Sequence, residues 1–546
     1  MVSYIYIVDK KTIIKGPYNF DYYQFRKLLN SLFYGLTAPK AISSRNLIAD
    51  FGLNSILCNE LINLLYQQAI ITNNNRSSLL FSQWKVYFRE ICGYEFESKK
   101  NLRRIVEVNY GIKKPDIETL TFAIHTYFSI ILTFLAVKVG EVISKSFDAD
   151  HWLAMSTEQD TDALHDNLNI IFQNTPFKEI GFTNLIEPTF FSWFIEEKEN
   201  KIYEKIRIIA KVVSEYSTST LKIHDIHESD ILKELYQSLS PRELRHSLGE
   251  FYTPDWLAEH TLLRLKYSPK PGIKTIDPTC GSGTFIIAAI NAYKSANSSL
   301  EPEQLSRNIL ADIKGIDLNP LAVAASKINY LIALGEENLV ALEGSDIEIP
   351  IYLSDSMLAP LEHKYETGDE YVIPTKVANF SVKKSFVDDR RFIETMAALE
   401  EAIKNRDTYK SFRQRLMATL KWTSPEIDDA LENTYSILQE LENKGLNGIW
   451  VGIIKNFFAP TFIGMSDYII GNPPWVNWEN LPESYRDSIK KYWSEYAYNL
   501  FRIKGIQARL GSAHDDICVL LYTTTLILAH NAPNLLYRTC ERAMEF

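Results

Sequence analysis

Cysteine is scarce in this sequence, with five residues among 546, and the five are scattered along the chain. They form no CxxC pair and no Cys/His pattern with the spacing of metal ligands. The sequence therefore predicts neither a disulfide framework nor a structural zinc site, and we expect a protein of a reducing compartment without bound metal. No secretory signal is evident, since residues 2–8 read as a β-strand followed by a charged turn. We therefore expect a cytoplasmic protein.

Positive charge is also in short supply, with 58 Lys and Arg against 68 Asp and Glu and a formal net charge of −10. A protein that holds duplex DNA normally presents a basic surface. The acidic total still allows a local basic cleft, and a group of basic residues lies between Lys490 and Arg509. A solvated helix face would explain this group equally well, so charge neither supports nor excludes a nucleic-acid partner.

One stretch lacks charged residues altogether. Residues 119–137 contain no Asp, Glu, Lys or Arg, and their length approaches the roughly 20 residues of a membrane span. They also include His125 and several threonines and serines, which would be unfavourable against lipid. We therefore expect a buried helix in a helical domain and no membrane partner.

The chain is long enough for two or three domains, and its 46% hydrophobic content is ample for their cores. The predicted organisation is a helical N-terminal domain over 1–238, the first part of an α/β core over 239–360, a helical insertion over 361–458, and a second, incomplete part of the core over 459–546. Within the insertion, helical spacing relates Phe392, Met396, Leu399 and Ile403. We expect the chain to return to the sheet at residues 449–458.

The most informative motif is Asn472-Pro473-Pro474-Trp475. It follows an apolar run, residues 468–471, that is typical of a buried strand in an α/β sheet. The two prolines stiffen the turn at the carboxyl end of this strand, where open α/β sheets bind their ligands. A stiff turn holds the Asn472 amide and the neighbouring carbonyls as fixed hydrogen-bond acceptors, with the Trp475 ring beside them. This arrangement suits a flat substrate that bears an exocyclic amine.

A second motif lies about two hundred residues upstream. A short strand ends at Asp277, Gly281 and Gly283 allow a sharp turn close to a ligand, and an apolar helix begins at Phe285. Another strand ends at Asp317, whose carboxylate suits a ribose diol. The forty residues between the two aspartates exceed the roughly twenty of the dinucleotide fingerprint, and its third glycine is absent. We therefore do not expect a nicotinamide cofactor.

Four blocks of the sequence resemble the N6-adenine DNA methyltransferases, specifically the large enzymes of restriction–modification and related phage-defence systems. In chain order the blocks are Gly249–Pro254, Asp277–Thr284, Gly315–Ala322 and Gly471–Trp475, with a shorter match at Ser354-Asp355-Ser356. The resemblance covers about residues 240–360 and 460–530. It implies an α/β fold with a doubly wound, Rossmann-like methyltransferase sheet, flanked here by the helical N-terminal domain and the helical insertion.

The resemblance also implies S-adenosylmethionine as the cofactor, DNA as the partner and methylation of adenine N6 as the reaction. The cofactor-binding residues that it implies are Tyr252, Thr253 and Pro254 at the methionine end, Asp277, Pro278, Gly281 and Gly283 in the cofactor loop, Asp317 and Leu318 at the ribose, and Asp355 at the adenine amine. The catalytic residues that it implies are Asn472, Pro473, Pro474 and Trp475. No cysteine follows a proline, which excludes a cytosine-C5 methyltransferase, and Asn472 in place of a serine favours adenine over cytosine N4.

Several alternatives stay open. Glutamine and ribosomal RNA methyltransferases share the Asn-Pro-Pro motif but are usually far smaller. A nuclease in the N-terminal domain would need Pro-Asp followed shortly by Glu-x-Lys, whereas Glu196-Glu197-Lys198 follows Pro115-Asp116 only after about eighty residues. Only 71 residues follow Trp475. We therefore expect a chain truncated after the catalytic motif, or half of a split enzyme whose target-recognition domain lies on a missing C-terminal segment or a second polypeptide. The last alternative is a catalytically silent DNA-binding or assembly subunit of such a system.

Overall fold

The computed structural model describes most of the chain between residues 40 and 474. The described residues are 2–8, 11–18, 40–90, 100–144, 146–187, 189–218, 230–247, 252–354, 356, 366–367, 370–374, 378–387, 391–444, 450–458, 466–474, 476, 486, 518 and 521. Two predicted site residues, Asp355 and Trp475, lie outside them, as do Gly249, Glu250 and Phe251 of the first motif block.

The N-terminal half of the chain is mostly helical. It begins with an antiparallel hairpin of β1 (Val2–Val8) and β2 (Lys11–Tyr18), as the strand pattern of residues 2–8 predicts. The helices that follow are α2 (Ser44–Phe51), α3 (Ile56–Ile71), α4 (Asn75–Glu90), α5 (Lys100–Tyr110), α6 (Ile117–Ile143), α7 (Ala149–Met155), α8 (Thr161–Phe172), α9 (Thr175–Lys178), η1 (Phe190–Ser192), α10 (Trp193–Glu197), α11 (Asn200–Ser214), α12 (Ile231–Leu239) and α13 (Arg242–Ser247). Two short strands, β3 (Lys40–Ala41) and β4 (Tyr216–Ser217), pair in parallel.

Helix α6 is the central element of this helical region. Asp116 caps its N-terminus by accepting a hydrogen bond from the Thr119 backbone N–H at 3.0 Å, so the Pro-Asp pair weighed for a nuclease has a structural role. The helix is long and apolar enough to cross a membrane, but 94% of its most apolar stretch is buried inside the protein. The prediction of a buried helix at residues 119–137 is confirmed.

A four-stranded parallel sheet follows in the chain. Its strands are β5 (Thr275–Asp277), β6 (Ile313–Asp317), β7 (Ile351–Leu353) and β11 (Tyr468–Ile469), in the spatial order β11-β5-β6-β7. The associated helices are α14 (Asp255–Leu265), α15 (Thr284–Ala296), α16 (Pro302–Asp312), α17 (Pro320–Leu334) and α18 (Glu336–Val340). Helices α15 and α17 pack against β6 and against each other. The predicted α/β fold with a Rossmann-like parallel sheet is confirmed.

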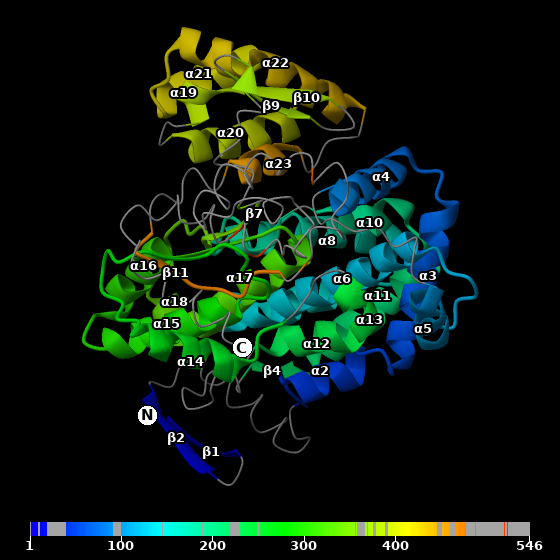
Figure 1. Ribbon diagram of the computed structural model, residues 1–546, viewed down its shortest axis with the longest axis vertical. Coiled ribbons are helices and arrows are strands. Elements are labelled where there is room, and N and C mark those ends of the chain that lie inside the picture. Colours follow the sequence, from blue (N-terminus) through cyan, green and yellow to red (C-terminus); the bar gives the residue numbers. More distant parts are fainter. Residues whose placement is uncertain are drawn as a thin grey trace, which may run out of the picture.

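The insertion separates β7 from β11 and lies at one end of the molecule, where Figure 1 shows it in yellow. It contains α19 (Lys384–Val387), α20 (Phe392–Lys404), α21 (Tyr409–Thr419), α22 (Ser424–Asn443) and α23 (Trp450–Phe457). As the helical spacing predicts, the apolar stripe of α20 is buried, at Phe392, Met396, Leu399 and Ile403. The insertion is not purely helical, however, because β8 (Glu366–Thr367), β9 (Glu370–Pro374) and β10 (Asn379–Lys383) form an antiparallel sheet.

The prediction that residues 449–458 return to the sheet is wrong. This segment forms α23, and Trp450, Ile454 and Phe458 are each at most 1% exposed. Their spacing of four residues places them on one face of a helix, which packs on α20 and β7. A short apolar run does not by itself distinguish a buried strand from a buried helix. The chain re-enters the sheet ten residues later, at Tyr468–Ile469.

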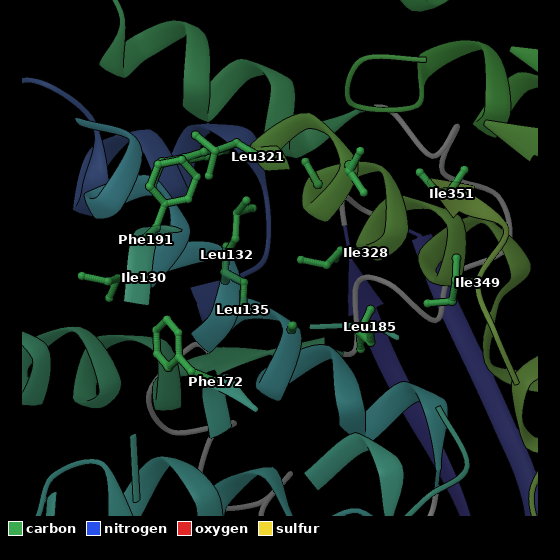
Figure 2. Packing of buried hydrophobic residues seen from close by; sticks show 14 of the residues in the cluster. Ile130, Leu132, Leu135, Phe172, Leu185, Phe191, Leu321, Ile328, Ile349 and Ile351 are labelled. Atoms are coloured by element: carbon green, nitrogen blue, oxygen red, sulfur yellow. The ribbon is translucent and has the colours of Figure 1, made fainter. Parts of the chain in front are cut away.

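The helical region shares one large hydrophobic core with the helices of the sheet and with one part of the sheet, whereas Ile276 of β5 and Ile316 of β6 form a separate small cluster. Figure 2 shows side chains of α6, including Leu132 and Leu135, in one cluster with Leu321 and Ile328 of α17. A cavity of about 980 Å³ lies beside this cluster, between the helical region, α17 and the insertion. None of the predicted site residues that the structure describes lines the cavity, so the candidate site must be sought at the edge of the sheet.

Candidate active site

The order of the strands places the candidate site. From β5 the sheet grows through β6 to β7 on one side, and β11 is added on the other side of β5. All four strands are parallel, but the side on which successive strands are added changes between β5 and β11. In open α/β sheets, the crevice outside the carboxyl ends of two such strands is the usual ligand site. The two motifs predicted from the sequence follow β5 and β11 directly.

The turns after β5 and β11 approach each other closely. The backbone N–H of Ile470 donates to the Ile276 carbonyl at 2.9 Å, which fixes the register. At Gly471, with φ of +154°, an added Cβ would lie 2.5 Å from Oδ1 of Asp277. Glycine is therefore needed here for the close approach, and it brings Asn472, Pro473 and Pro474 beside the end of β5. These three residues are partly exposed at this edge of the sheet.

Asp277 is the buried residue that lies between the turns after β5 and β11. It is 1% exposed, and its Oδ1 accepts the Thr279 backbone N–H at 3.1 Å. Burial raises the pKa of the Asp277 carboxyl well above its ordinary value, and the nearby Asp317 raises it further. The carboxyl therefore holds its proton to a higher pH than a surface aspartate does. The next residue, Pro278, is buried as well.

The two glycines of the cofactor loop have different roles. Both have left-handed φ angles, +55° at Gly281 and +96° at Gly283. A Cβ at Gly283 would lie 2.7 Å from Oγ of Ser326 on α17, so this glycine allows the loop to pack on that helix. A Cβ at Gly281 would meet no atom within 4 Å. Among the described residues, nothing therefore fills the space beside Gly281.

Asp317 joins the end of β6 to the same loop. Its Oδ2 accepts the Gly281 backbone N–H at 2.8 Å, and its Oδ1 accepts the Asn319 backbone N–H at 2.7 Å. Burial raises the pKa of Asp317, against the backbone N–H donors of Asn319, Gly281 and Leu318, which lower it. Asp317 and Leu318 remain partly exposed. The two carboxylate oxygens together have four lone pairs, so with these three donors one remains for a ligand hydroxyl.

The segment of Tyr252, Thr253 and Pro254 lies on α12, in an arrangement that the sequence did not predict. Nζ of the buried Lys233 donates to the Thr253 carbonyl at 2.9 Å and to Oδ1 of Asp255 at 2.8 Å. The ring of Tyr252 packs edge-on against that of Tyr236, with 5.9 Å between ring centroids. Thr253 is buried, Tyr252 is partly exposed, and Pro254 is exposed.

Asp230, at the N-cap of α12, fixes the other side of this arrangement. Its Oδ2 accepts hydrogen bonds from the hydroxyls of Ser282 and Thr284, in the cofactor loop and at the start of α15. Its Oδ1 accepts from Nδ2 of Asn329 at 2.8 Å and from the Lys233 backbone N–H at 3.0 Å. Asp230 is 1% exposed, and this burial raises its pKa. Its only sequence signal is an ordinary helix cap, because the partners are 52 to 99 residues away.

Cys280 is the one cysteine of the predicted cofactor loop, and it is 6% exposed. Burial raises the pKa of its thiol well above the ordinary value, with Asp317 and Asp277 adding to the effect. A neutral, buried thiol is a poor nucleophile. The loop therefore offers backbone clearance and hydrogen bonding to a ligand, and it offers no covalent nucleophile at this position.

Comparison with known proteins finds a family that is similar to the middle of the chain. Residues 227–421 match the family described as N-6 DNA Methylase. A curated relative, the adenine-specific methyltransferase PglX of Streptomyces coelicolor (strain ATCC BAA-471 / A3(2) / M145), is 31% identical over 140 residues, which cover 23% of this chain. The match spans only 12% of the length of that relative. The matched family region begins just before Asp230 and Lys233, and includes the cofactor loop and Asp317.

Solved structures give weaker likenesses. A nuclease-deletion mutant of the Type ISP restriction-modification enzyme LlaGI, in complex with a DNA substrate mimic, aligns with 92% of this chain and 30% of its own, at 11% identity and a TM-score of 0.34. A modification subunit of a putative type I restriction enzyme from Vibrio vulnificus YJ016 aligns over 52% of this chain and 55% of its own, at 14% identity and a TM-score of 0.26. At these TM-scores the likenesses add nothing to the argument. Residues 227–421 are therefore similar to N-6 DNA methylases, the family that the motifs of the sequence resemble, and the curated relative is an adenine-specific methyltransferase.

Proposed function

We propose that this protein transfers a methyl group from S-adenosylmethionine to N6 of adenine in DNA, as part of a restriction–modification or related defence system. The observation that carries the proposal is the close approach of Gly471 to Asp277 between β11 and β5, where the order of the strands changes side. It brings the Asn-Pro-Pro turn and the glycine loop to one crevice. The N-6 DNA Methylase match and the PglX relative support the same reaction class.

The crevice fits S-adenosylmethionine in three respects. No described residue fills the space beside Gly281, the partly exposed Asp317 has a lone pair left for a ribose hydroxyl, and Tyr252 lines the same small cavity as Ser282 of the cofactor loop. A cavity of about 10 Å³, lined by residues that include Tyr252, Ser282 and Asn319, lies between that segment and the loop. In this assignment Tyr252, Thr253 and Pro254 hold the methionine end, and Asp355 receives the adenine amine.

The reaction needs an acceptor base outside its helix. The target adenine cannot meet the cofactor while it is stacked in a duplex, so it must be flipped into the crevice at a cost of a few kcal/mol. In the proposed mechanism Trp475 stacks on the flipped base and recovers part of that cost, since such stacking is worth roughly 1–3 kcal/mol. Asn472 Oδ1 and the Pro473 carbonyl accept the two amine hydrogens. The stiffness that Pro473 and Pro474 give to the turn keeps these acceptors in place.

These hydrogen bonds draw the nitrogen lone pair out of conjugation with the ring and direct it at the methyl group. S-adenosylmethionine, when bound, supplies an electrophilic methyl group on a sulfonium. On methylation the nitrogen would become cationic and release one hydrogen to water as a proton, while the sulfonium would become a neutral thioether that leaves. Neither a covalent intermediate nor a strong general base is therefore required, which agrees with the buried, neutral thiol of Cys280. Alignment of the reacting atoms and fixed hydrogen-bond acceptors supply most of the acceleration.

The variant Asn472→Ala tests the proposal. It should lose methyl transfer to DNA while keeping most of its affinity for S-adenosylmethionine, because Asn472 contacts the base rather than the cofactor. The matched control is Asn308→Ala on α16, a helix that leads into the opposite end of β6, and it should leave both quantities unchanged. Full transfer activity in Asn472→Ala would contradict the proposed role of the motif.

DNA is the proposed substrate, and its target sequence must be recognised before a base is methylated. We propose that reading of the target sequence depends on a second polypeptide. With a net charge of −10, any affinity of the chain for DNA must come from a local basic surface. Binding by the 546-residue chain should then be weak and fall steeply with salt, as phosphate contacts do. Gel-shift titrations over a salt series check this, and tight, sequence-selective binding would contradict it.

A further inference from the structure

Lys233 is a buried cation that joins three separate segments of the chain. Only 6% of the residue is exposed, and it lies in the first turn of α12. Its Nζ donates to the Thr253 carbonyl at 2.9 Å and to Oδ1 of Asp255 at 2.8 Å, and lies 3.5 Å from Oγ1 of Thr284. Burial of an ammonium group is costly unless charge and hydrogen-bond partners compensate it. The position is therefore unfavourable for a residue that only fills space.

The partners of Lys233 belong to the two walls of the proposed methionine site. Thr253 is the middle residue of the segment proposed to line that end of the cofactor, and Thr284 is the first residue of α15, directly after the glycine loop. Asp230, three residues earlier on the chain, holds Ser282 of the same loop. One turn of α12 thus contacts both walls and sets the distance between them.

A small space remains between these walls. The cavity of about 10 Å³ is lined by Lys233 and Tyr236 of α12, by Tyr252, and by Ser282 and Asn319 near the ends of β5 and β6, among others. This volume is that of about one water molecule. A side chain at position 233 that no longer bound Thr253 would let the Tyr252–Pro254 segment move with respect to the loop.

We infer that Lys233 is a positioning residue for the methionine end of S-adenosylmethionine: through Thr253 and Asp255 it fixes the Tyr252–Pro254 segment against the Ser282–Thr284 end of the cofactor loop. The inference rests on the proposed function. Lys233 acts through its neighbours and makes no contact with the reacting atoms. Its loss should therefore affect ligands that carry the amino-acid end of the cofactor, and spare those that lack it.

The test compares two ligands in isothermal titration calorimetry: S-adenosylmethionine, and 5′-methylthioadenosine, which lacks the amino-acid end. In Lys233→Met the affinity for S-adenosylmethionine should fall about tenfold or more, equivalent to the loss of one charge-assisted hydrogen bond. The affinity for 5′-methylthioadenosine should stay within about twofold. Lys233→Arg, which keeps a charged donor, should recover most of the affinity for S-adenosylmethionine.

Lys138→Met is the matched control. Lys138 is 5% exposed and pairs with Glu141 at 2.8 Å and Asp150 at 3.2 Å in the helical region. This variant loses the same kind of buried ion pair and should bind both ligands as the wild type does. Thermal unfolding of both Met variants shows how much of any effect is lost stability. If Lys233→Met is too unstable to titrate, Lys233→Gln, which keeps a neutral donor, should show the same selective loss to a smaller degree.

The outcomes separate this inference from the proposed function. Equal weakening of both ligands in the Lys233 variants would show a general structural role and overturn the inference, as would unchanged affinity for S-adenosylmethionine. Either result leaves the proposed function intact, because the wild type still binds the cofactor. A wild-type protein that bound neither ligand would overturn the proposed function itself, and the role of Lys233 with it.

Discussion

Replacement of Gly471 by alanine should uncouple the two halves of the candidate site. The new Cβ would lie 2.5 Å from Oδ1 of Asp277, short of an ordinary 3.4 Å contact by about 0.9 Å. Asp277 has little freedom to yield, since it is 1% exposed and its Oδ1 accepts the Thr279 N–H. The Asn-Pro-Pro turn must therefore move by most of this distance and carry Asn472 with it. A displacement of about 1 Å can cost on the order of 100-fold in rate.

We accordingly expect Gly471→Ala to reduce methyl transfer to DNA roughly 100-fold and to lower the free energy of unfolding by about 1–3 kcal/mol, as overpacking does. Initial rates of tritiated-methyl incorporation at saturating cofactor, together with urea unfolding, measure the two effects. The control is Gly452→Ala in α23, where a Cβ meets no atom within 4 Å. It should keep its rate and gain about 0.4–1 kcal/mol of stability. A Gly471→Ala rate within twofold of wild type would refute this reasoning.

Three further predictions concern the cofactor side of the site. Gly281→Ala and Gly272→Ala both place a side chain at positive φ in open space, so both variants should lose about 1–2 kcal/mol of stability. Only Gly281→Ala should weaken the binding of S-adenosylmethionine measured by calorimetry. Equal affinities of the two variants would argue against a ligand beside Gly281. Asp317→Ala should weaken the same binding by about 1.5–3 kcal/mol, the worth of hydrogen bonds to a charged group, and an unchanged affinity would remove Asp317 from the ribose site. Because the pKa of Asp277 is raised, its carboxyl group keeps its proton to a higher pH in the folded state than in the unfolded chain. The resulting contribution to stability is present below about pH 4 and is lost as the pH rises through the folded-state pKa. The difference in unfolding free energy between wild type and Asp277→Asn should therefore fall with rising pH, and a difference that is flat across pH would contradict the shift.

The sequence predicted the elements whose signal is local. The uncharged run at 119–137 is a buried helix, and the stripe from Phe392 to Ile403 packs as its helical spacing requires. The β9–β10 ribbon was missed because each strand has only five residues, and periodicity is a weak signal over that length. Residues 449–458 were assigned to the sheet because a short apolar run fits a buried strand and a buried helix equally well.

Part of the site could be predicted because ligand-binding residues in α/β sheets lie at the carboxyl ends of strands. Asp277 and Asp317 each end a strand of one parallel sheet and Asn472 closely follows a third, so their shared edge could be inferred from the order of the motifs. The contacts of Asp230 and Lys233 could not, because their partners are 20 to 99 residues away and neither residue stands out in the sequence. Such a polar network becomes visible only when the fold brings α12 against the cofactor loop.

The identity of the methylated product tests the central claim most directly. The protein is incubated with DNA and S-adenosylmethionine that carries an isotopically labelled methyl group, and the DNA is digested to nucleosides for mass spectrometry. The account predicts label in N6-methyldeoxyadenosine, with none in Asn472→Ala. Label in a cytosine nucleoside or in protein, or equal labelling of adenine by Asn472→Ala, would contradict it.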